Sequence, residues 1–393
     1  MEANVGLFNE SFPPVMDGVA VCVQNYAYWL QKKVGGVSVI TPNKTGANYG
    51  QYPYEVLDYI SVAVPFRHPY VTGIAQIDPL LRAKLSRRRF KIVHAHSPFS
   101  AGLMAAQVAK SQNIPLVATF HSKFKDDFLK VVPSEMLVDQ AIKIVMEFFD
   151  KADEVWIPQA SVEEVIREYG YKGHVEVVDN GSDLVADYSD SFFIESRKAL
   201  GIAPNELVLL FVGQHIWQKN VRLIIDGLER IKDLPFKMFF VGTGYAAAEM
   251  KELVEQKGLS SKVTFTGMLT EREQIVRYYA ASDLFLFPSL YDNAPLVVRE
   301  AAALHTPSIM VEGSTAATIL KDCQNGFLIS NDLDSFEACL RRLAQDRELV
   351  KRVGLEAAGT IVRSWEDVVD EVLDRYNALI ERKTRIRPLP TRQ

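Results

Sequence analysis

The sequence predicts an α/β protein of two doubly wound, Rossmann-like domains in tandem, with a deep cleft between them. Three observations support this fold class. Short apolar runs rich in Val, Ile and Phe alternate with longer amphipathic stretches along the chain, and this alternation pauses once near the middle. The length of 393 residues also suits two domains better than one.

In the first half, the alternation of expected strands and helices predicts a parallel sheet. Expected strands lie near residues 4–9, 36–41, 57–64, 91–96, 115–120, 154–158 and 175–178. Amphipathic helical patterns separate most of them, for example over Val19–Lys33 and Ser134–Lys151. Strand–helix alternation at this spacing is typical of a parallel sheet that helices cover on both faces.

The second half repeats the pattern after a break at Asp179–Asp183, where Asn-Gly between aspartates favours a turn. Its expected strands lie near residues 206–212, 236–241, 262–266, 284–287, 307–311 and 326–329. We therefore expect an N-terminal domain of residues 1–183 and a C-terminal domain of residues 184–363. Residues 364–393 should form a terminal helix that packs back towards the N-terminal domain, followed by a frayed basic tail.

Composition narrows the class of protein. Apolar residues make up 48% of the chain and charged residues 24%, which is typical of a packed globular protein. The net charge of −5 argues against nucleic acid as a partner. No apolar run approaches the ~20 residues of a membrane span, and the N-terminal residues lack the features of a signal peptide, so we expect a cytoplasmic protein.

Cys22, Cys323 and Cys339 show no metal-ligand spacing and are expected to be reduced and structural.

One basic run departs from the acidic average. It consists of Arg82, Lys84, Arg87, Arg88, Arg89 and Lys91. This run could contact an anionic membrane surface, which would place the protein peripherally at the inner face of the membrane. The alternative is a solvated helix end that leads into a strand.

The loop after the first expected strand opens a long helix at Gly18. A glycine at a helix start lets a phosphate approach the backbone and the free N–H groups there. The alternative is a tight turn in which Asp17 caps the helix.

A second candidate segment, Val212–Asn220, occupies the corresponding place in the second half. It combines a strand end, Gly213, and Lys219 about one turn into the next element. Lys219 would provide a compact positive charge for a diphosphate leaving group, which becomes more negative as its bond breaks. An ordinary surface lysine is the alternative.

The third candidate segment carries two acids. Asp292 follows a buried strand, and Glu300 lies about two turns into the next helix. The loop acid could accept hydrogen bonds from sugar hydroxyls and the helix acid from ribose hydroxyls, while the N–H groups of Leu296 and Val297 could face a phosphate. A carboxylate among apolar residues also needs a partner if it is buried.

Three histidines lie at expected strand ends. His94 and His96 alternate on one strand, and His121 ends another. His94 and His96 could bind a metal as a pair, but no third ligand stands at a spacing typical of metal sites. We therefore expect no metal, and hydrogen bonding to a polyol or to the backbone. His121 is the better candidate for contact with a reacting sugar.

Two further motifs have simpler interpretations. Gly242-Thr243-Gly244 matches a relaxed dinucleotide fingerprint, but it follows the second strand of its domain and no acid ends the next strand. Asp332-Leu333-Asp334 opens a helix, where aspartates commonly cap, so we interpret it as a cap and not as a metal motif.

With these segments placed, nearly the whole chain resembles the family 4 glycosyltransferases, which are retaining enzymes of GT-B fold. The resemblance rests on the order and spacing of several motifs. It implies that Gly18 faces the donor diphosphate, that His121 lies beside the transferred sugar and that Lys219 grips the diphosphate. Asp292 and Glu300 occupy the two ends of the family's Glu-x7-Glu signature. Asn180–Asp183 resembles the motif that closes the amino domain, and Gly267, Met268 and Leu269 fall where the nucleobase binds.

The chain departs from the family pattern at three positions. Gln214, after Gly213, stands where the family usually has an arginine, so one expected positive charge on the diphosphate is missing. Asp292 is one methylene shorter than the family's glutamate, which bears on sugar preference. Asp17 stands where a glycine is common, and an Asp-Gly pair there is similar to a lipid-directed subset of the family.

The resemblance implies transfer of a hexosyl group from a nucleotide diphosphate sugar to a hydroxyl of a lipid or glycan. The expected donor is a UDP-linked sugar, and we expect no cofactor and no metal. Three alternatives stay open from the residues: a catalytically silent sugar-nucleotide-binding subunit, a phosphorylase on the same scaffold, and an NAD enzyme. Nothing in the sequence singles out one acceptor or an oligomeric state.

Overall fold

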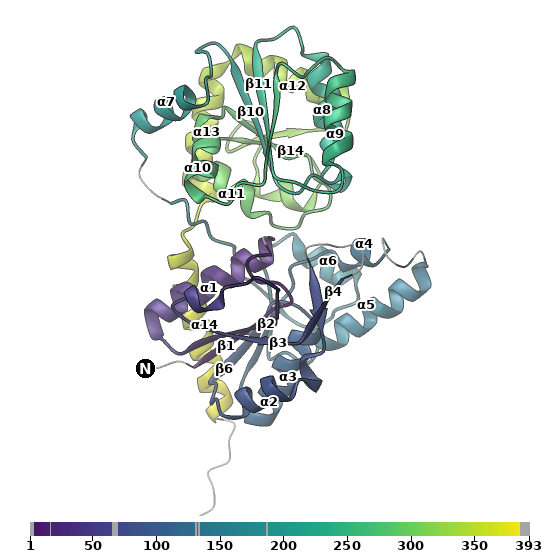
Figure 1. Cartoon of the computed structure of the whole chain (residues 1–393), viewed down its shortest axis with the longest axis vertical. Helices are drawn as coiled ribbons and strands as arrows, with labels where there is room; N and C mark the ends of the chain where they lie inside the picture. The colour runs from purple at the N-terminus through teal and green to yellow at the C-terminus, as the bar shows by residue number, and fades with distance from the viewer. Residues whose placement is uncertain are drawn as a thin grey trace, which may run out of the picture. The chain divides into compact units, whose positions relative to one another are not determined.

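The computed structural model describes residues 4–15, 17–64, 70–129, 132, 134–185 and 188–385. The chain divides into two units, one made of Met1–Gly181 with Trp365–Gln393 and the other of Ser182–Ser364 (Figure 1). The two crossings between units lie beside the boundaries expected after residues 183 and 363.

The first unit is built on a parallel sheet with the order β3-β2-β1-β6-β7-β8-β9. Its strands are β1 (Val5–Phe8), β2 (Val37–Pro42), β3 (Glu55–Tyr59), β6 (Ile92–Ala95), β7 (Leu116–Thr119), β8 (Glu154–Ile157) and β9 (Val175–Val177). Every residue of β1, β6 and β7 is buried, as befits parallel strands with both faces covered. The strand order reverses between β1 and β6, so the loops after these strands border the place where doubly wound sheets take ligands.

Helices cover this sheet on both sides (Figure 1). They are α1 (Gly18–Val34), α2 (Pro79–Ser86), α3 (Ser100–Gln112), α4 (Phe124–Leu129), α5 (Glu135–Phe149), α6 (Val162–Glu168) and α14 (Trp365–Arg385), with short 3-10 turns η1 (Tyr49–Gln51) and η2 (Ala75–Ile77). The basic run expected near a helix end begins in α2 and continues into the connection to β6.

One expected strand is wrong in extent. The run near 57–64 splits into β3 and a separate strand β4 (Ser61–Ala63), which pairs antiparallel with β5 (Val71–Gly73). The split occurs at Ile60, whose N–H donates to Oδ2 of Asp78 at 2.9 Å and so leaves the sheet ladder. Strand β5 was not among the strands predicted from the sequence.

The second unit repeats the architecture with a parallel sheet of order β12-β11-β10-β13-β14-β15. Its strands are β10 (Leu207–Val212), β11 (Phe236–Val241), β12 (Val263–Gly267), β13 (Leu284–Leu286), β14 (Ser308–Val311) and β15 (Phe327–Ile329). Its helices are α7 (Asp190–Ala199), α8 (Val221–Arg230), α9 (Ala247–Gln256), α10 (Arg272–Ala281), α11 (Leu296–Ala303), α12 (Leu333–Gln345) and α13 (Arg347–Ile361), with the 3-10 turns η3 (Trp217–Lys219) and η4 (Thr315–Ile319). The order reverses between β10 and β13, so the loops after these strands meet at the switch point.

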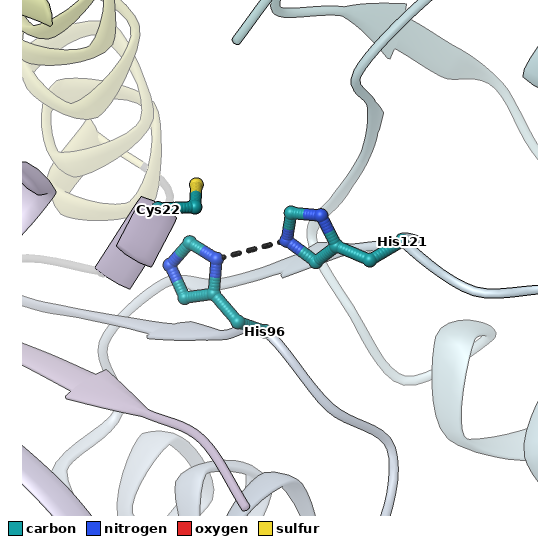
Figure 2. A group of neighbouring side chains, drawn as sticks. All are labelled: Cys22, His96 and His121. Atoms are coloured by element: carbon teal, nitrogen blue, oxygen red, sulfur yellow. Dashed lines mark hydrogen bonds between the residues drawn. The ribbon is translucent and has the colours of Figure 1, made fainter. Parts of the chain in front are cut away.

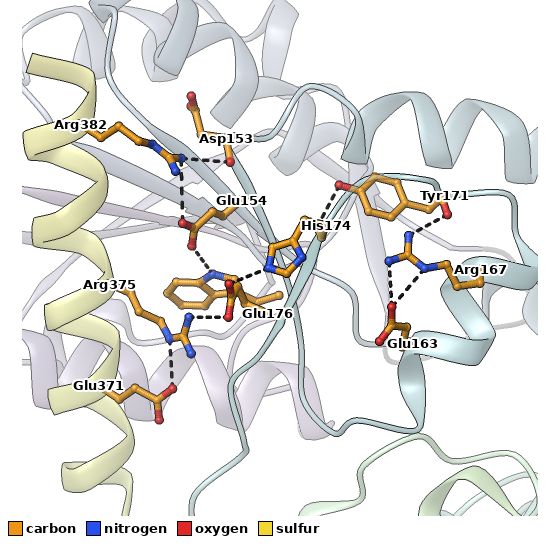
Figure 3. Close-up of polar contacts among 11 residues, drawn as sticks. Asp153, Glu154, Glu163, Arg167, Tyr171, His174, Glu176, Glu371, Arg375 and Arg382 are labelled. Atoms are coloured by element: carbon orange, nitrogen blue, oxygen red, sulfur yellow. Dashed lines mark hydrogen bonds and ion pairs between the residues drawn. The ribbon is translucent and has the colours of Figure 1, made fainter. Parts of the chain in front are cut away.

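The last helix, α14, lies beside α1 in the first unit. Lys33 of α1 donates to Glu366 at 3.2 Å and pairs with Asp370 at 2.9 Å. Farther along, Arg375 donates to Glu176 of β9 at 3.0 Å, part of a charged network between α14 and the strands β8 and β9 (Figure 3). These contacts give α14 fixed partners in the unit that begins the chain.

Asp332 is the N-cap of α12 and accepts a hydrogen bond from the Ser335 N–H at 2.8 Å, so the interpretation of Asp332-Leu333-Asp334 as a cap is confirmed. Among the helices that the structure describes, none combines the length and the apolar character needed to cross a membrane.

Candidate functional site

The carboxyl edge of the second sheet brings together Lys219 and Asp292. Lys219 ends η3, just after β10, and Asp292 lies in the loop between β13 and α11. Nζ of Lys219 donates to Oδ1 of Asp292 at 2.5 Å, and the two side chains are only 14% and 16% exposed. Because β10 and β13 are neighbours, residues 73 positions apart in sequence form one charged pair at this edge.

Asp292 is held from its other side by Ser289. Ser289 is fully buried, and its hydroxyl donates to Oδ2 of Asp292 at 2.6 Å while accepting the Tyr291 N–H at 3.2 Å. Asn220, in a left-handed conformation with φ of 58°, donates to the Pro288 carbonyl at 3.2 Å. The loops that carry Lys219 and Asp292 are thus joined by the Asn220 side chain as well as by the ion pair.

The remaining donor-site candidates of this unit follow the same strands. Gly213 and the exposed Gln214 come after β10. Gly267 ends β12 with φ of 75°. After it come Met268, which is 60% exposed, and the half-buried Leu269.

The start of α11 contributes backbone donors. Leu296 and Val297 are half-buried and form the first turn of the helix. The N-cap residue is Pro295, whose side chain has no polar atom to cap that turn. The first-turn N–H groups and the helix dipole therefore favour a negative charge at this position.

Glu300 is buried in α11 with two partners that the sequence analysis did not identify. It is 8% exposed; Oε1 accepts from Nη2 of Arg272 at 2.7 Å, and Oε2 accepts from the hydroxyl of Tyr279 at 2.9 Å. Burial raises the pKa of Tyr279 well above its usual value, and the Glu300 carboxylate raises it further. Burial lowers the pKa of Arg272, but the Glu300 and Asp183 carboxylates outweigh that effect and raise it overall.

The glycines of the relaxed dinucleotide fingerprint have a packing role. A Cβ on Gly242, which has φ of 128°, would lie 2.0 Å from the Gly213 carbonyl oxygen, and one on Gly244 would lie 2.3 Å from that of His215. The loops after β10 and β11 therefore cross backbone against backbone. This contact accounts for both glycines without a dinucleotide.

In the first unit, His96 and His121 follow the neighbouring strands β6 and β7. Nδ1 of His96 and Nε2 of His121 share a hydrogen bond of 3.1 Å between nearly parallel rings (Figure 2). His94 instead bonds through its two nitrogens to Tyr376 and Thr119, each at 2.7 Å. Burial lowers the pKa of His121 to about 4 and those of His94 and His96 well below their usual range, so all three imidazoles are neutral at pH 7.

Cys22 of α1 joins this pair. One potential ligand atom each from Cys22, His96 and His121 lie within 4.8 Å of one another (Figure 2). Atoms that bind one Zn²⁺ at about 2.0–2.3 Å lie within about 4 Å of each other, so these side chains would have to draw together to hold an ion. Burial also raises the pKa of the Cys22 thiol, which disfavours the thiolate that a metal requires.

Gly18 and Asp17 begin α1. Oδ1 of Asp17 accepts the Ala20 N–H at 2.8 Å, so the alternative in which Asp17 caps the helix is confirmed. Gly18 is exposed, and a Cβ on it would meet nothing within 4 Å. Packing therefore does not require a glycine here, and the space beside its backbone is open.

Glu10, after β1, is a further, half-buried acid that the sequence analysis passed over. Its Oε1 accepts the Ala101 N–H at the start of α3 at 2.6 Å, and its Oε2 accepts from Tyr59 at 3.1 Å. Burial raises the pKa of Glu10 to about 6, although these hydrogen bonds lower it in part. Its place at the carboxyl end of β1 was the signal that could have identified it.

Two hollows of the first unit, of about 630 and 580 Å³, lie at the opposite edge of its sheet. Residues of both precede the strands, as Lys91 and Pro115 do in the larger one. Ligands of doubly wound sheets bind at the carboxyl ends of strands, so we assign the candidate site to those ends and not to these hollows.

Two family models together match most of the chain. A sequence model described as "Glycosyltransferase Family 4" matches residues 16–185, and one described as "Glycosyl transferases group 1" matches residues 192–359. An alpha-monoglucosyldiacylglycerol synthase of Streptococcus pneumoniae is 24% identical over 353 residues, which is 86% of this chain and 78% of that protein.

Two solved structures illustrate the shared fold. HepE of Anabaena, in complex with UDP and glucose, has a TM-score of 0.79 and 17% identity, with 96% of this chain and 100% of that chain covered. A sucrose-phosphate synthase of Thermosynechococcus elongatus has a TM-score of 0.81 and 18% identity, with 97% and 100% covered. The two Rossmann-like halves of this chain are thus those of GT-B glycosyltransferases.

Proposed function

Because the chain belongs to the family 4 glycosyltransferases, we propose that it moves a hexosyl group from a UDP-linked sugar to a hydroxyl of a lipid or glycan acceptor, with retention at the anomeric carbon. The bond between the anomeric carbon and the diphosphate oxygen breaks, and a bond from that carbon to the acceptor oxygen forms. The acceptor proton leaves with the departing phosphate or passes to solvent.

The observation that carries this proposal is the shielded pair of Lys219 and Asp292 at the switch point of the second sheet. The departing diphosphate gains negative charge in the transition state, and an ammonium group in a poorly hydrated place stabilises such charge most strongly. The N–H groups of Leu296 and Val297 supply the second source of stabilisation. Asp292 orients Lys219 and accepts hydrogen bonds from the sugar.

We propose that this stabilisation needs no divalent metal. A lone ammonium and peptide dipoles take the place that a cation has in metal-dependent transferases. Gly213, Gln214 and the segment Gly267–Leu269 complete the donor site, with the last of these beside the nucleobase.

For the first unit, we propose that His121 contacts the transferred sugar and that Gly18 lets a phosphate approach the backbone. Because the His121 imidazole is neutral, its contact with the sugar would add no charge to the site. The similarity to the alpha-monoglucosyldiacylglycerol synthase of Streptococcus pneumoniae supports a lipid acceptor. We propose that the protein reaches this acceptor from the cytoplasmic side by peripheral contact with the membrane.

A thermal-shift screen of nucleotide sugars tests the donor assignment. A ligand that binds the folded state raises the melting temperature, so UDP-glucose, UDP-galactose, UDP-N-acetylglucosamine and GDP-mannose can be compared directly. We expect UDP-linked sugars to raise it most and Lys219→Ala to reduce the shift. No shift with any nucleotide sugar would contradict the proposal.

A second function, a catalytically silent sugar-nucleotide-binding subunit, is favoured by one observation. Gln214 stands in place of the arginine usual in the family, so one charge on the diphosphate is missing. Calorimetry that detects donor binding, with no turnover across lipid and glycan acceptors, would favour this function over the transferase.

A further inference from the structure

The carboxylate of Glu300 is held in one orientation by two donors on α10. Nη2 of Arg272 lies 2.7 Å from Oε1, and the Tyr279 hydroxyl lies 2.9 Å from Oε2. Tyr279 is fully buried, and the Glu300 side chain is 11% exposed. The plane of the carboxylate is therefore set by α10 and not by α11, which carries it.

This arrangement leaves capacity for a ligand. An ionised carboxylate has about four acceptor positions, and the two contacts use one on each oxygen. Each oxygen can accept one more hydrogen bond, and the neighbouring 2′- and 3′-hydroxyls of a ribose present two donors at matching spacing. Oriented in this way, Glu300 suits a diol better than a single hydroxyl.

Arg272 is itself oriented by Asp183. Nε donates to Oδ2 of Asp183 at 2.9 Å and Nη2 to Oδ1 at 2.5 Å, a two-pronged contact that fixes the plane of the guanidinium. The second hydrogen of Nη2 then points to Glu300. Only an arginine can bridge two carboxylates in this manner, because a lysine ammonium lacks the planar guanidinium group with its several N–H donors.

Asp183 occupies a defined place. It lies in the segment where the chain enters the second unit, next to Ser182, whose N–H donates to the Arg363 carbonyl at 2.8 Å. Ser182 is buried, and its hydroxyl accepts the Leu184 N–H at 3.1 Å. Asp183 is therefore anchored on both sides, and the order Asp183, Arg272, Glu300 forms one chain of charged hydrogen bonds.

We propose that Arg272 is a positioning residue for the donor's ribose, which acts by fixing the Glu300 carboxylate and is itself fixed by Asp183. The proposal rests on the proposed function, because it takes Glu300 to bind the ribose of a nucleotide donor. It goes further in assigning the selectivity for ribose over deoxyribose to a residue that does not touch the nucleotide.

The test compares ribo- and deoxyribonucleotides by calorimetry on the full chain. UDP, GDP and ADP are titrated alongside their 2′-deoxy forms, so that the result does not depend on which base the protein takes. We expect the wild type to prefer the ribonucleotide. In Arg272→Met that nucleotide should bind about ten-fold more weakly, whereas its 2′-deoxy form, which offers Glu300 only the 3′-hydroxyl, should lose less affinity, so the preference narrows.

Two further variants keep the test decisive if Arg272→Met does not fold. Arg272→Lys retains the positive charge but lacks the planar guanidinium. Asp183→Asn removes the negative charge and one of the two oxygens that accept from Arg272. Each variant should lower the preference in part. Arg277→Met is the matched control, because Arg277 lies on the same helix with similar exposure, and among the residues that the structure describes its carboxylate partner is Glu273. Its ribose preference should equal that of the wild type.

The outcomes separate this inference from the proposed function. A folded Arg272→Met that keeps the full ribose preference overturns the role of Arg272 and leaves the transferase proposal standing. A wild type that binds a nucleotide with no ribose preference overturns the assignment of Glu300 to the ribose, and with it this inference. A wild type that binds none of the six nucleotides overturns both.

Discussion

The Nζ atom of Lys219 lies 2.5 Å from Oδ1 of Asp292, and both side chains are largely shielded from solvent. The pair is neutral as a whole, so a diphosphate group must compete with Asp292 for the ammonium. Such competition favours the leaving group over the intact donor, because the leaving group carries more negative charge. The pair can therefore stabilise the transition state more than the bound substrate.

Lys219→Ala should lower kcat by about 10²–10³-fold, the range seen when one transition-state donor is removed. KM for the donor should rise less, since the loss is larger in the transition state. Steady-state kinetics with a fixed acceptor measure both. Lys257→Ala is the control, because Lys257 is also ion-paired and 18% exposed but pairs with Asp226 and Glu229 instead. Equal losses in the two variants would refute a special role for Lys219.

Gln214→Arg should raise kcat/KM for the donor by ten-fold or more, because it adds a second positive charge where the family usually has one. A charge contact in such a site is worth ~2–4 kcal/mol at most. Gln214 is exposed, so a longer side chain can be accommodated. Gln256→Arg adds the same charge at an exposed position at the end of α9, and its rate should stay at the wild-type level.

Removal of divalent metals should leave the transfer rate unchanged. Lys219 and the N–H groups of α11 are proposed to supply the positive charge in place of a divalent metal. A chelator should therefore not affect the site. The measurement is the initial rate after dialysis against a chelator, with and without added Mg²⁺ or Mn²⁺. A rate that depends strictly on Mn²⁺ would rule out the mechanism.

Titration of His121 should destabilise the protein in acid. Burial lowers the pKa of His121 from 6.5 to about 4. Below pH 6.5, His121 therefore becomes protonated in the unfolded chain while it stays neutral in the folded state. This contribution to stability is full above pH 6.5 and is lost as the pH falls towards 4. Histidine NMR signals should show a neutral His121 ring down to about pH 5. A titration midpoint near 6.5 would contradict the burial argument.

Glu10 should act in the opposite direction. Burial raises its pKa to about 6 from 4.5, so the folded state holds the proton more tightly than the unfolded chain does. Its contribution is full below pH 4.5 and is lost as the pH rises through about 6, which amounts to about 2 kcal/mol.

Glu10→Gln removes this titration. The amide oxygen can still accept the Ala101 N–H, so the fold should persist. Urea unfolding of wild type and variant between pH 4 and 7 should show that the stability difference shifts in favour of the variant as the pH rises. A difference that does not change with pH would show that Glu10 has an ordinary pKa.

Much of the fold could be predicted because its signals are local. Buried runs such as Leu207–Val212 mark parallel strands by composition alone, and the turn residues at Asn180 and Gly181 mark the crossing between units. Asp17 and Asp332 were recognisable as caps because a cap and the N–H it accepts lie three residues apart.

Only the tertiary structure decided which side chains meet. The sequence placed Glu300 on a helix and required a partner for it, but Arg272 and Tyr279 come from another helix whose position depends on the order of the strands. In the same way, the approach of Gly242 to the Gly213 carbonyl and the bond between His96 and His121 follow from which strands are neighbours. Periodicity and turn chemistry act over a few residues, whereas these contacts depend on strand pairing and helix packing, which no short stretch of sequence encodes.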